Sequence, residues 1–220
     1  MSNDFRPDGD APRYFGLYPA IVTNLVDQDG LGRIEVSFPW LGADGATVRA
    51  WATLLSPYAD QDQGFQVLPE RDTQVVVGFE AGSLRRPYIV GAAWNGKESL
   101  AVSPEKANNK RIIKTRSGSI LEFDDTGGAV KVTLSTKSGH QLILKDSPQE
   151  VSLEHQNGCK ITMNAAGQVK INATSTVDIT ASVVNVHAPM ALFDGTIKCT
   201  TLITTSVVSS SYTPGAGNIW

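Results

Sequence analysis

The side chains of this sequence that could perform acid–base or metal chemistry are mostly carboxylates in short polar stretches. Asp27 and Asp29 stand two residues apart, as do Asp60 and Asp62. Carboxylates spaced in this way could ligate calcium or act as a catalytic acid and base. Aspartate in such stretches more often forms a turn, because its side chain accepts backbone N–H bonds, and we adopt that interpretation.

Two further patterns could indicate an enzyme. Glu70 and Asp72 could form an acid–base pair, but a glycosidase needs a substrate cleft and the sequence indicates none, so we interpret both as solvated. The Ser-Gly dipeptides of the second half could carry nucleophiles, but no strand-to-helix turn follows them. We therefore predict no catalytic residue and a protein that is not an enzyme.

Histidine and cysteine are too sparse to indicate a metal centre. None of the three histidines stands in an HxH or HxxxH spacing, and the two isolated cysteines, Cys159 and Cys199, are interpreted as small buried hydrophobes. His140 and His155 share the parity of neighbouring apolar residues, so symmetry copies could bind an ion on an axis. A surface position is the favoured interpretation, and we predict neither a metal nor a cofactor.

Composition excludes several classes of protein. Hydrophobic residues make up 41% and charged residues 19% of the 220, which is a globular balance. The net charge of −3 and the scattered arginines give no basic groove, so Trp40 and Trp51 are expected to pack in a core and not to stack on nucleic acid. No run of 18 apolar residues is present, and the start lacks the apolar region of a secretory signal.

The first half predicts a small β-barrel. Short β-like segments alternate with turn signals, and proline ends one of them because it cannot donate to a ladder. Five strands with uneven loops in about 80 residues are typical of an OB-fold. The predicted strands are 20–25, 33–38, 48–54, 73–79 and 87–92.

The second half is a repeat. Ser117-Gly118 and its following β-like residues recur at Ser138-Gly139 and at Asn157-Gly158, and the unit then shortens to a β triplet followed by alanine. Paired apolar residues recur about every eight to eleven residues, which is typical of a β-solenoid. From 171 to 213 the only charged residues are Asp178, Asp194 and Lys198.

Strands with so few inward apolar side chains cannot enclose a core alone. A single chain would expose a hydrophobic face and unpaired sheet edges, whereas three copies around one axis would cover both. We therefore predict an obligate homotrimer shaped as a triangular prism, with a single-chain β-helix as the alternative. The predicted trimer core contains Leu142, Leu144, Ile161, Met163, Val169, Ile171, Val177 and Ile179.

These blocks resemble the baseplate assembly protein V family of contractile phage tails and the matching core of VgrG spikes. The resemblance rests on the segments 18–24, 29–40, 51–57, 69–80 and 86–91, followed by the Ser-Gly and Asn-Gly repeat. It implies an OB-fold collar and an intertwined trimeric β-helix. It also implies a central spike beneath the tail tube, pushed through the target cell envelope when the sheath contracts.

Departures from that pattern shape the expected partners. Only the connector 95–110 stands where a related spike carries a lysozyme domain, and only about 15 residues precede the OB-fold where VgrG proteins carry a hub, so we expect a separate hub protein. The iron-binding HxH of some short spikes is missing, so no metal is carried over. The end, 212–220, could seat a PAAR-type tip protein or close the needle itself.

The sequence therefore predicts an all-β protein with an N-terminal arm (1–15), an OB-fold (16–94), a linker (95–110) and a trimeric β-helix with its tip (111–220). It would be assembled in the cytoplasm as part of a virion, tailocin or contractile injection particle. Two other classes remain open: an OB-fold module that binds single-stranded nucleic acid or carbohydrate, and a carbohydrate-active β-helix enzyme.

Overall fold

A computed structural model describes residues 12–42 and 47–211. The tip at 212–220 therefore lies outside the described residues. The same is true of most of the predicted N-terminal arm and of most of a turn expected at 42–45. The chain divides into two units, residues 1–174 and 175–220. All regular elements of the described residues are β-strands apart from one short 3-10 helix, η1 (Glu80–Gly82), which agrees with the predicted all-β class.

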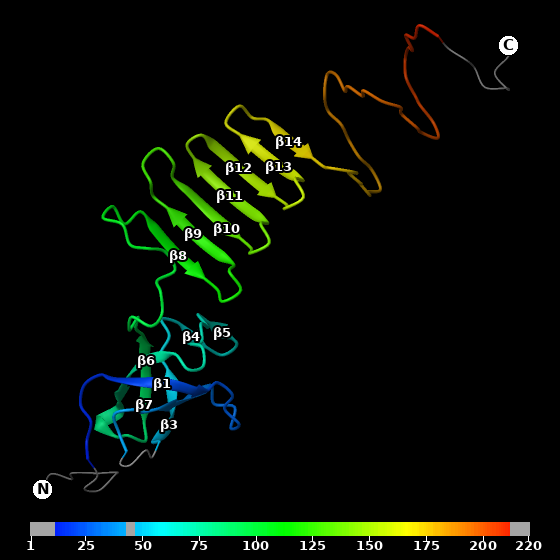
Figure 1. The fold of residues 1–220 in the computed structure, drawn as a ribbon. Helices are drawn as coiled ribbons and strands as arrows, with labels where there is room; N and C mark the ends of the chain where they lie inside the picture. Colours follow the sequence, from blue (N-terminus) through cyan, green and yellow to red (C-terminus); the bar gives the residue numbers. More distant parts are fainter. Residues whose placement is uncertain (1–11, 43–46, 212–220) are drawn as a thin grey trace, which may run out of the picture. The chain divides into compact units, whose positions relative to one another are not determined.

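The N-terminal part is a closed five-stranded barrel (Figure 1). Its hydrogen-bonded order is β1-β2-β3-β7-β6, with β3 and β7 parallel and the other neighbours antiparallel, which is an OB-like arrangement. The five strands predicted from the sequence are confirmed, with ends shifted by two residues or fewer. They are β1 (Tyr18–Asn24), β2 (Arg33–Ser37), β3 (Arg49–Leu54), β6 (Gln74–Phe79) and β7 (Pro87–Ala92).

Alternation along these strands builds the barrel core. In β2 the side chains of Ile34 and Val36 point inward with Phe38 just beyond, and none is more than 1% exposed. Because a barrel closes on itself, every strand finds two neighbours and the inward side chains meet from all sides. The core comprises Ala20, Val22, Ile34, Val36, Phe38, Ala52, Val75, Val77 and Ile89.

The segment between β3 and β6 contains a hairpin that the sequence did not indicate. Strands β4 (Ala59–Asp60) and β5 (Gln63–Gly64) pair with each other and with no other strand. The Ser56 hydroxyl lies 2.9 Å from the carbonyl oxygen of Tyr58 and 2.8 Å from that of Phe65, which closes the base of the hairpin. Apolar and turn-forming residues are mixed here without strict alternation, so no strand pattern marks the segment in the sequence.

The second half begins with a seven-stranded antiparallel sheet in which each strand pairs with the next along the chain (Figure 1). We had expected intertwined strands from residue 111 onward. Across β8–β14 the backbone ladders are instead made within one chain, because each strand returns through a tight turn beside its predecessor. The strands are β8 (Lys110–Lys114), β9 (Ile120–Asp124), β10 (Lys131–Ser135), β11 (Gln141–Asp146), β12 (Gln149–Glu154), β13 (Lys160–Asn164) and β14 (Val169–Asn172).

The recurring Ser-Gly and Asn-Gly dipeptides form one repeated turn. Gly118, Gly139 and Gly158 have φ angles of 92°, 94° and 94°, and each donates its N–H to the carbonyl three residues earlier. A type I turn followed by a left-handed glycine is a common hairpin connection, and glycine is preferred because it carries no Cβ. The sequence repeat is therefore the signature of a repeated hairpin.

The residues after β14 are extended along the described part of their path. Residues 173–211 contain no strand and no backbone–backbone hydrogen bond within the described chain, whereas the preceding strand β14 pairs with β13. Valine, isoleucine and threonine dominate this segment, and these residues favour strands. A β-prone backbone without partners indicates that its hydrogen bonds are made elsewhere or to water.

We predict that Gly139→Ala destabilises the sheet by roughly 1–2 kcal/mol, because an L-residue is strained at a left-handed φ. Space is not limiting, since the nearest atom to the new Cβ, Cβ of Gln156, would lie 3.8 Å away. Denaturant unfolding at fixed protein concentration measures the effect. Gly127→Ala is the matched control, because its φ is not left-handed and a Cβ there meets nothing within 4 Å. Equal losses in both variants would contradict the assignment of the turn.

Candidate functional site

The most distinctive surface of the sheet is one apolar face. Because directly paired residues of an antiparallel sheet point to the same side, the register assembles two rows of apolar side chains across the strands. We call this surface the apolar face. One row contains Ile113, Leu121, Leu134, Leu142, Leu153, Ile161 and Ile171, and the other contains Phe123, Val132, Leu144, Val151, Met163 and Val169.

The apolar face is not covered by the chain itself. Its members from Leu142 onward include side chains between 37% exposed (Ile161) and 64% exposed (Val169), whereas the barrel core is at most 1% exposed. Six of the eight predicted trimer-core residues lie on this face. Their burial between chains stays a prediction, but an open apolar surface of this extent is a recognised mark of an interaction site.

The opposite face of the same strands carries charge. Lys145 pairs with Glu150 at 3.0 Å and Lys160 with Glu154 at 2.6 Å, each directly across neighbouring strands. Hydrogen bonding by Lys160 lowers the pKa of Glu154. Single exposed pairs add little stability, but opposite charges facing each other favour this register. A shift of one residue would bring these charges onto the apolar face, so the two faces are strongly specified.

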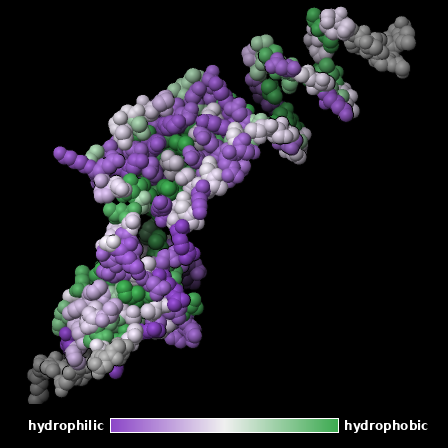
Figure 2. All heavy atoms as spheres, in the orientation of Figure 1, coloured by the Kyte–Doolittle hydropathy of each residue, from purple (hydrophilic) through white to green (hydrophobic). Residues whose placement is uncertain are grey.

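The extended segment 173–211 also presents uncovered hydrophobic side chains, seen in green in Figure 2. Val177 and Ile179, the two remaining predicted core residues, are 53% and 72% exposed, and Val208 is 99% exposed. These side chains occur on a backbone without ladder partners. This combination of apolar side chains and unpaired backbone is what an isolated strand of a larger β-structure presents.

Asp27 forms the most elaborate polar cluster of the barrel, and the cluster is structural. Its side chain is 4% exposed and accepts N–H bonds from the backbones of Asp29, Leu31 and Arg33. The Arg33 guanidinium donates to Asp27 from Nε at 2.8 Å and Nη2 at 2.9 Å, and its Cζ lies 5.7 Å from the ring centroid of Trp51. The predicted turn-forming role of Asp27 is confirmed.

The other carboxylate pairs also lie in turns. Asp60 accepts the Gln61 N–H at 2.7 Å, and Asp62 has a left-handed φ of 54° at the tip of the β4–β5 hairpin. Asp72 has a φ of 64° and donates its backbone N–H to the Val22 carbonyl at 2.9 Å. Their backbone roles explain why these positions carry aspartate, which tolerates left-handed φ better than most residues.

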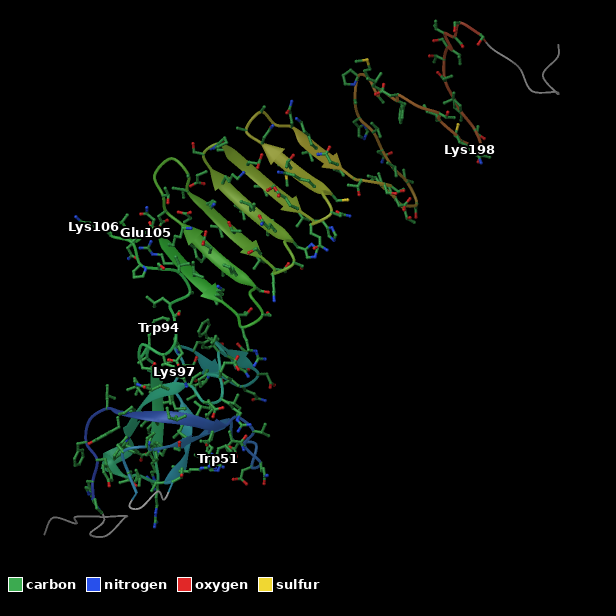
Figure 3. The ribbon with its side chains drawn as sticks, in the orientation of Figure 1. Trp51, Trp94, Lys97, Glu105, Lys106 and Lys198 are labelled. Carbon is green, nitrogen blue, oxygen red and sulfur yellow. The ribbon has the colours of Figure 1, made fainter. Side chains whose placement is uncertain are left out.

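Trp40 and Trp51 are used within the barrel. The Trp40 ring stacks on Tyr18 at a centroid distance of 4.7 Å, and its Nε1 donates to the Pro19 carbonyl at 2.7 Å. Trp51 lies beneath Arg33 on the barrel strand β3 (Figure 3). Trp40 therefore packs against the barrel core as predicted, whereas the prediction of a core position for Trp51 is wrong, because its half-buried ring lies outside the core cluster.

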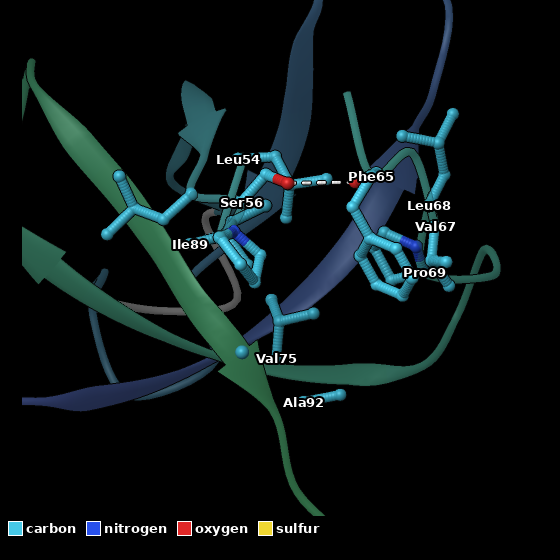
Figure 4. Close-up of a pocket in the computed structure, with 12 residues that line it drawn as sticks. Leu54, Ser56, Phe65, Val67, Leu68, Pro69, Val75, Ile89 and Ala92 are labelled. Carbon is cyan, nitrogen blue, oxygen red and sulfur yellow. Dashed lines mark hydrogen bonds between the residues drawn. The ribbon is translucent and has the colours of Figure 1, made fainter. Parts of the chain in front are cut away.

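An apolar pocket of about 270 Å³ opens at one end of the barrel (Figure 4). Core residues Val75 and Ile89 line it together with Leu54, Phe65 and Leu68. No acidic, basic or cysteine side chain lines it, and the Ser56 hydroxyl beside it is bonded to backbone carbonyls. The pocket offers shape and apolar contact without acid–base chemistry, and sequence reasoning did not find it because its residues come from separate strands.

The described residues contain no group of three or more His, Cys, Asp or Glu side chains arranged to hold a metal ion. Within residues 12–42 and 47–211 no helix has the length and hydropathy of a membrane span.

Comparison with known proteins agrees with this architecture. Residues 18–94, which contain the whole barrel, match the family of type VI secretion system/phage-baseplate injector OB domains. Over 170 residues the chain is 22% identical to the type VI secretion system spike protein VgrG5 of Pseudomonas aeruginosa. That match covers 73% of the chain and 21% of VgrG5, so the chain spans about a fifth of the length of this relative.

The barrel is thus an injector-type OB domain. Residues 18–94 belong to this OB-domain family, and the chain as a whole resembles VgrG and baseplate V-like proteins, as its sequence blocks indicated.

We predict that Asp27→Asn destabilises the barrel at neutral pH and that the difference from the unsubstituted chain shrinks in acid. Hydrogen bonds from Arg33 hold the pKa of Asp27 well below its ordinary value of 3.8. A carboxyl whose pKa is lowered by folding stabilises the fold above its ordinary pKa, and this stabilisation is lost as the pH falls through the folded value.

Thermal unfolding of both chains between pH 7 and pH 3 tests this dependence. Asp62→Asn is the control, because it removes an exposed carboxylate at a φ that asparagine tolerates. A difference that is independent of pH would contradict the role given to the Asp27 carboxylate.

Proposed function

We propose that this chain is the central spike of a contractile injection machine and works as a homotrimer without enzymatic activity. The observation that carries the proposal is the uncovered apolar face, continued in sequence by the apolar and unpaired segment 173–211. The relationship to a secretion-system spike protein supports the same role.

Three-fold assembly would cover the apolar face and would also supply backbone partners to the segment 173–211. Three sheets with their apolar faces inward form a closed prism, and the charged faces then lie outside. Full burial of a Leu, Ile, Val or Met side chain contributes about 1.5–3 kcal/mol, so covering half-exposed ones contributes roughly 1 kcal/mol each. In the segment 173–211, strands from the two other chains would supply the missing backbone partners, which is where the intertwined winding belongs.

The proposed work is mechanical. The barrel would attach the spike to a separate hub protein beneath the tail tube, and a PAAR-type protein could cap the C-terminal end. Sheath contraction would drive the assembly through the target envelope. The weak charge of 171–213 suits such passage, since a smooth surface of small polar residues offers few ionic contacts. Shared ladders would make the needle stiff, because removing one chain breaks many hydrogen bonds together.

Light scattering of the purified full chain tests the assembly. We expect a mass three times the 23.5 kDa of one chain. Ile171→Asp should reduce the mass to that of a monomer, because three carboxylates would meet in a dry interior. In the single chain Ile171 is 60% exposed, so the substitution leaves the fold of the sheet intact.

Lys170→Asp is the matched control, because Lys170 precedes Ile171 on β14 and lies on the opposite face. It should leave the trimer intact. A monomeric unsubstituted chain would overturn the proposed spike, and a trimer that survives Ile171→Asp would show that the apolar face is not its core.

A further inference from the structure

The apolar pocket of the barrel lies where the pairing of two strands stops. Strand β3 leaves β7 after Leu54, which pairs with Ile89, whereas β6 stays paired with the other side of β7 as far as Ala92. Within the described chain, β7 beyond Ile89 therefore has a neighbouring strand on one side only. Gly91 and Ala92 of this open edge line the pocket. An open edge presents backbone groups to which an extended segment can add.

The side chains around this edge are apolar and uncovered. Leu55, Phe65 and Val67 line the pocket, yet they are 50%, 54% and 59% exposed (Figure 4). A cluster of exposed apolar side chains beside unpaired backbone is typical of a surface that another segment covers. The pocket therefore has the properties of a binding site for an extended apolar segment.

The wall of the pocket formed by residues 56–72 is acidic beyond its apolar lining. Four acidic side chains against one basic side chain, Arg71, give this segment a net charge of −3. The acidic ones are Asp60, Asp62, Glu70 and Asp72. The three aspartates form no ion pair with another described residue. A basic partner segment would be attracted to this wall.

The connector 95–110 has the complementary apolar and backbone groups. Between residues 95 and 104 it makes no backbone–backbone hydrogen bond with another described residue. Leu100 and Val102 are 44% and 40% exposed, and Trp94, just before the connector, is 67% exposed. In an added strand, Leu100 and Val102 would point to the same side, because side chains alternate with a period of two.

The charge of the connector and of strand β8 is opposite to that of the pocket wall. Six basic side chains against two acidic ones give residues 95–116 a net charge of +4. Arg116 Nη1 already lies 3.0 Å from Glu70 Oε2 of the pocket wall. The basic side chains that form no ion pair with another described residue are Lys97, Lys106 and Lys114; the first two lie along the connector (Figure 3).

We propose that the barrel pocket binds the connector of a second copy of this chain. Leu100 and Val102 of one copy would enter the pocket of the next, and the connector backbone would add to the open edge of β7. The basic side chains of residues 95–116 would face the acidic wall 56–72. This inference rests on the proposed trimer, and it assigns to the barrel and connector a contact between copies.

Three-fold symmetry makes the proposed contact complete. Each barrel would receive the connector of one neighbour and its own connector would go to the other, so that three identical contacts close a ring. The connector leads directly into β8, the first strand of the apolar face. The contact would therefore extend the proposed trimer interface from the sheet to the barrel, and it would cover apolar groups that a single chain leaves exposed.

Photo-crosslinking of the full chain tests the occupant of the pocket. With Leu100→p-benzoylphenylalanine we expect covalent dimers and trimers on a denaturing gel, and crosslinked peptides that contain residues 65–68. The same probe at Leu31 is the control, because Leu31 is 67% exposed on the barrel and does not line the pocket. It should give no crosslink to residues 65–68.

The outcomes separate this inference from the proposed spike. If light scattering shows a trimer but the probe at position 100 reacts only within its own chain, or not with the pocket, the inference is wrong and the spike proposal stands. The pocket would then be left to its own connector or to another protein. A monomeric chain would overturn both.

Charge substitution tests the attraction between the two segments. Asp60→Lys combined with Asp62→Asn should raise the concentration at which the trimer dissociates by about fivefold or more at low salt, and by less at high salt. Asparagine tolerates the left-handed φ of position 62, and circular dichroism checks the fold. Adding Lys97→Asp and Lys106→Asp to the same chain should restore part of the loss. Equal dissociation of all three chains would contradict the proposed contact.

Discussion

The uncovered apolar face of the seven-stranded sheet is the constraint on which the rest of this molecule depends. Strict alternation along seven consecutive strands sends every second side chain to one side, and the tight turns keep the register constant. An antiparallel meander satisfies its internal backbone groups but cannot cover its own faces. The charged face can remain in water, whereas the apolar face requires another surface.

From the N-terminus to the C-terminus, the three regions of the chain pair fewer of their backbone groups and bury fewer of their apolar side chains. The barrel closes on itself and buries a core of nine side chains. The sheet pairs its backbone but leaves one face open. The segment 173–211 has neither ladder partners nor a core within the described chain. The proportion of unpaired backbone and uncovered apolar side chains therefore increases from the barrel toward the C-terminus, which is the order that the proposed spike requires.

The polar clusters of the barrel hold turns in place. Asp27 holds a turn and Arg33 through several hydrogen bonds, and the aspartates of the hairpin tip and of the turn before β6 occupy left-handed or turn positions. The pocket at the barrel end lacks titratable lining. The imidazoles of His140 and His155 lie in contact, with ring centroids 4.3 Å apart.

Local patterns in the sequence determined the all-β class, the five barrel strands, the sides to which Leu142, Leu144 and Ile171 point, and the resemblance to injector OB domains and VgrG-like proteins. Alternation and turn chemistry act over a few residues, so they can be read without knowing the fold. Only the tertiary structure decided that β8–β14 pair within one chain, that an apolar pocket forms beside Val75 and Ile89, and that His140 meets His155. Those features depend on which strand lies beside which, and pairing between strands is a non-local choice that residue parity alone leaves undetermined.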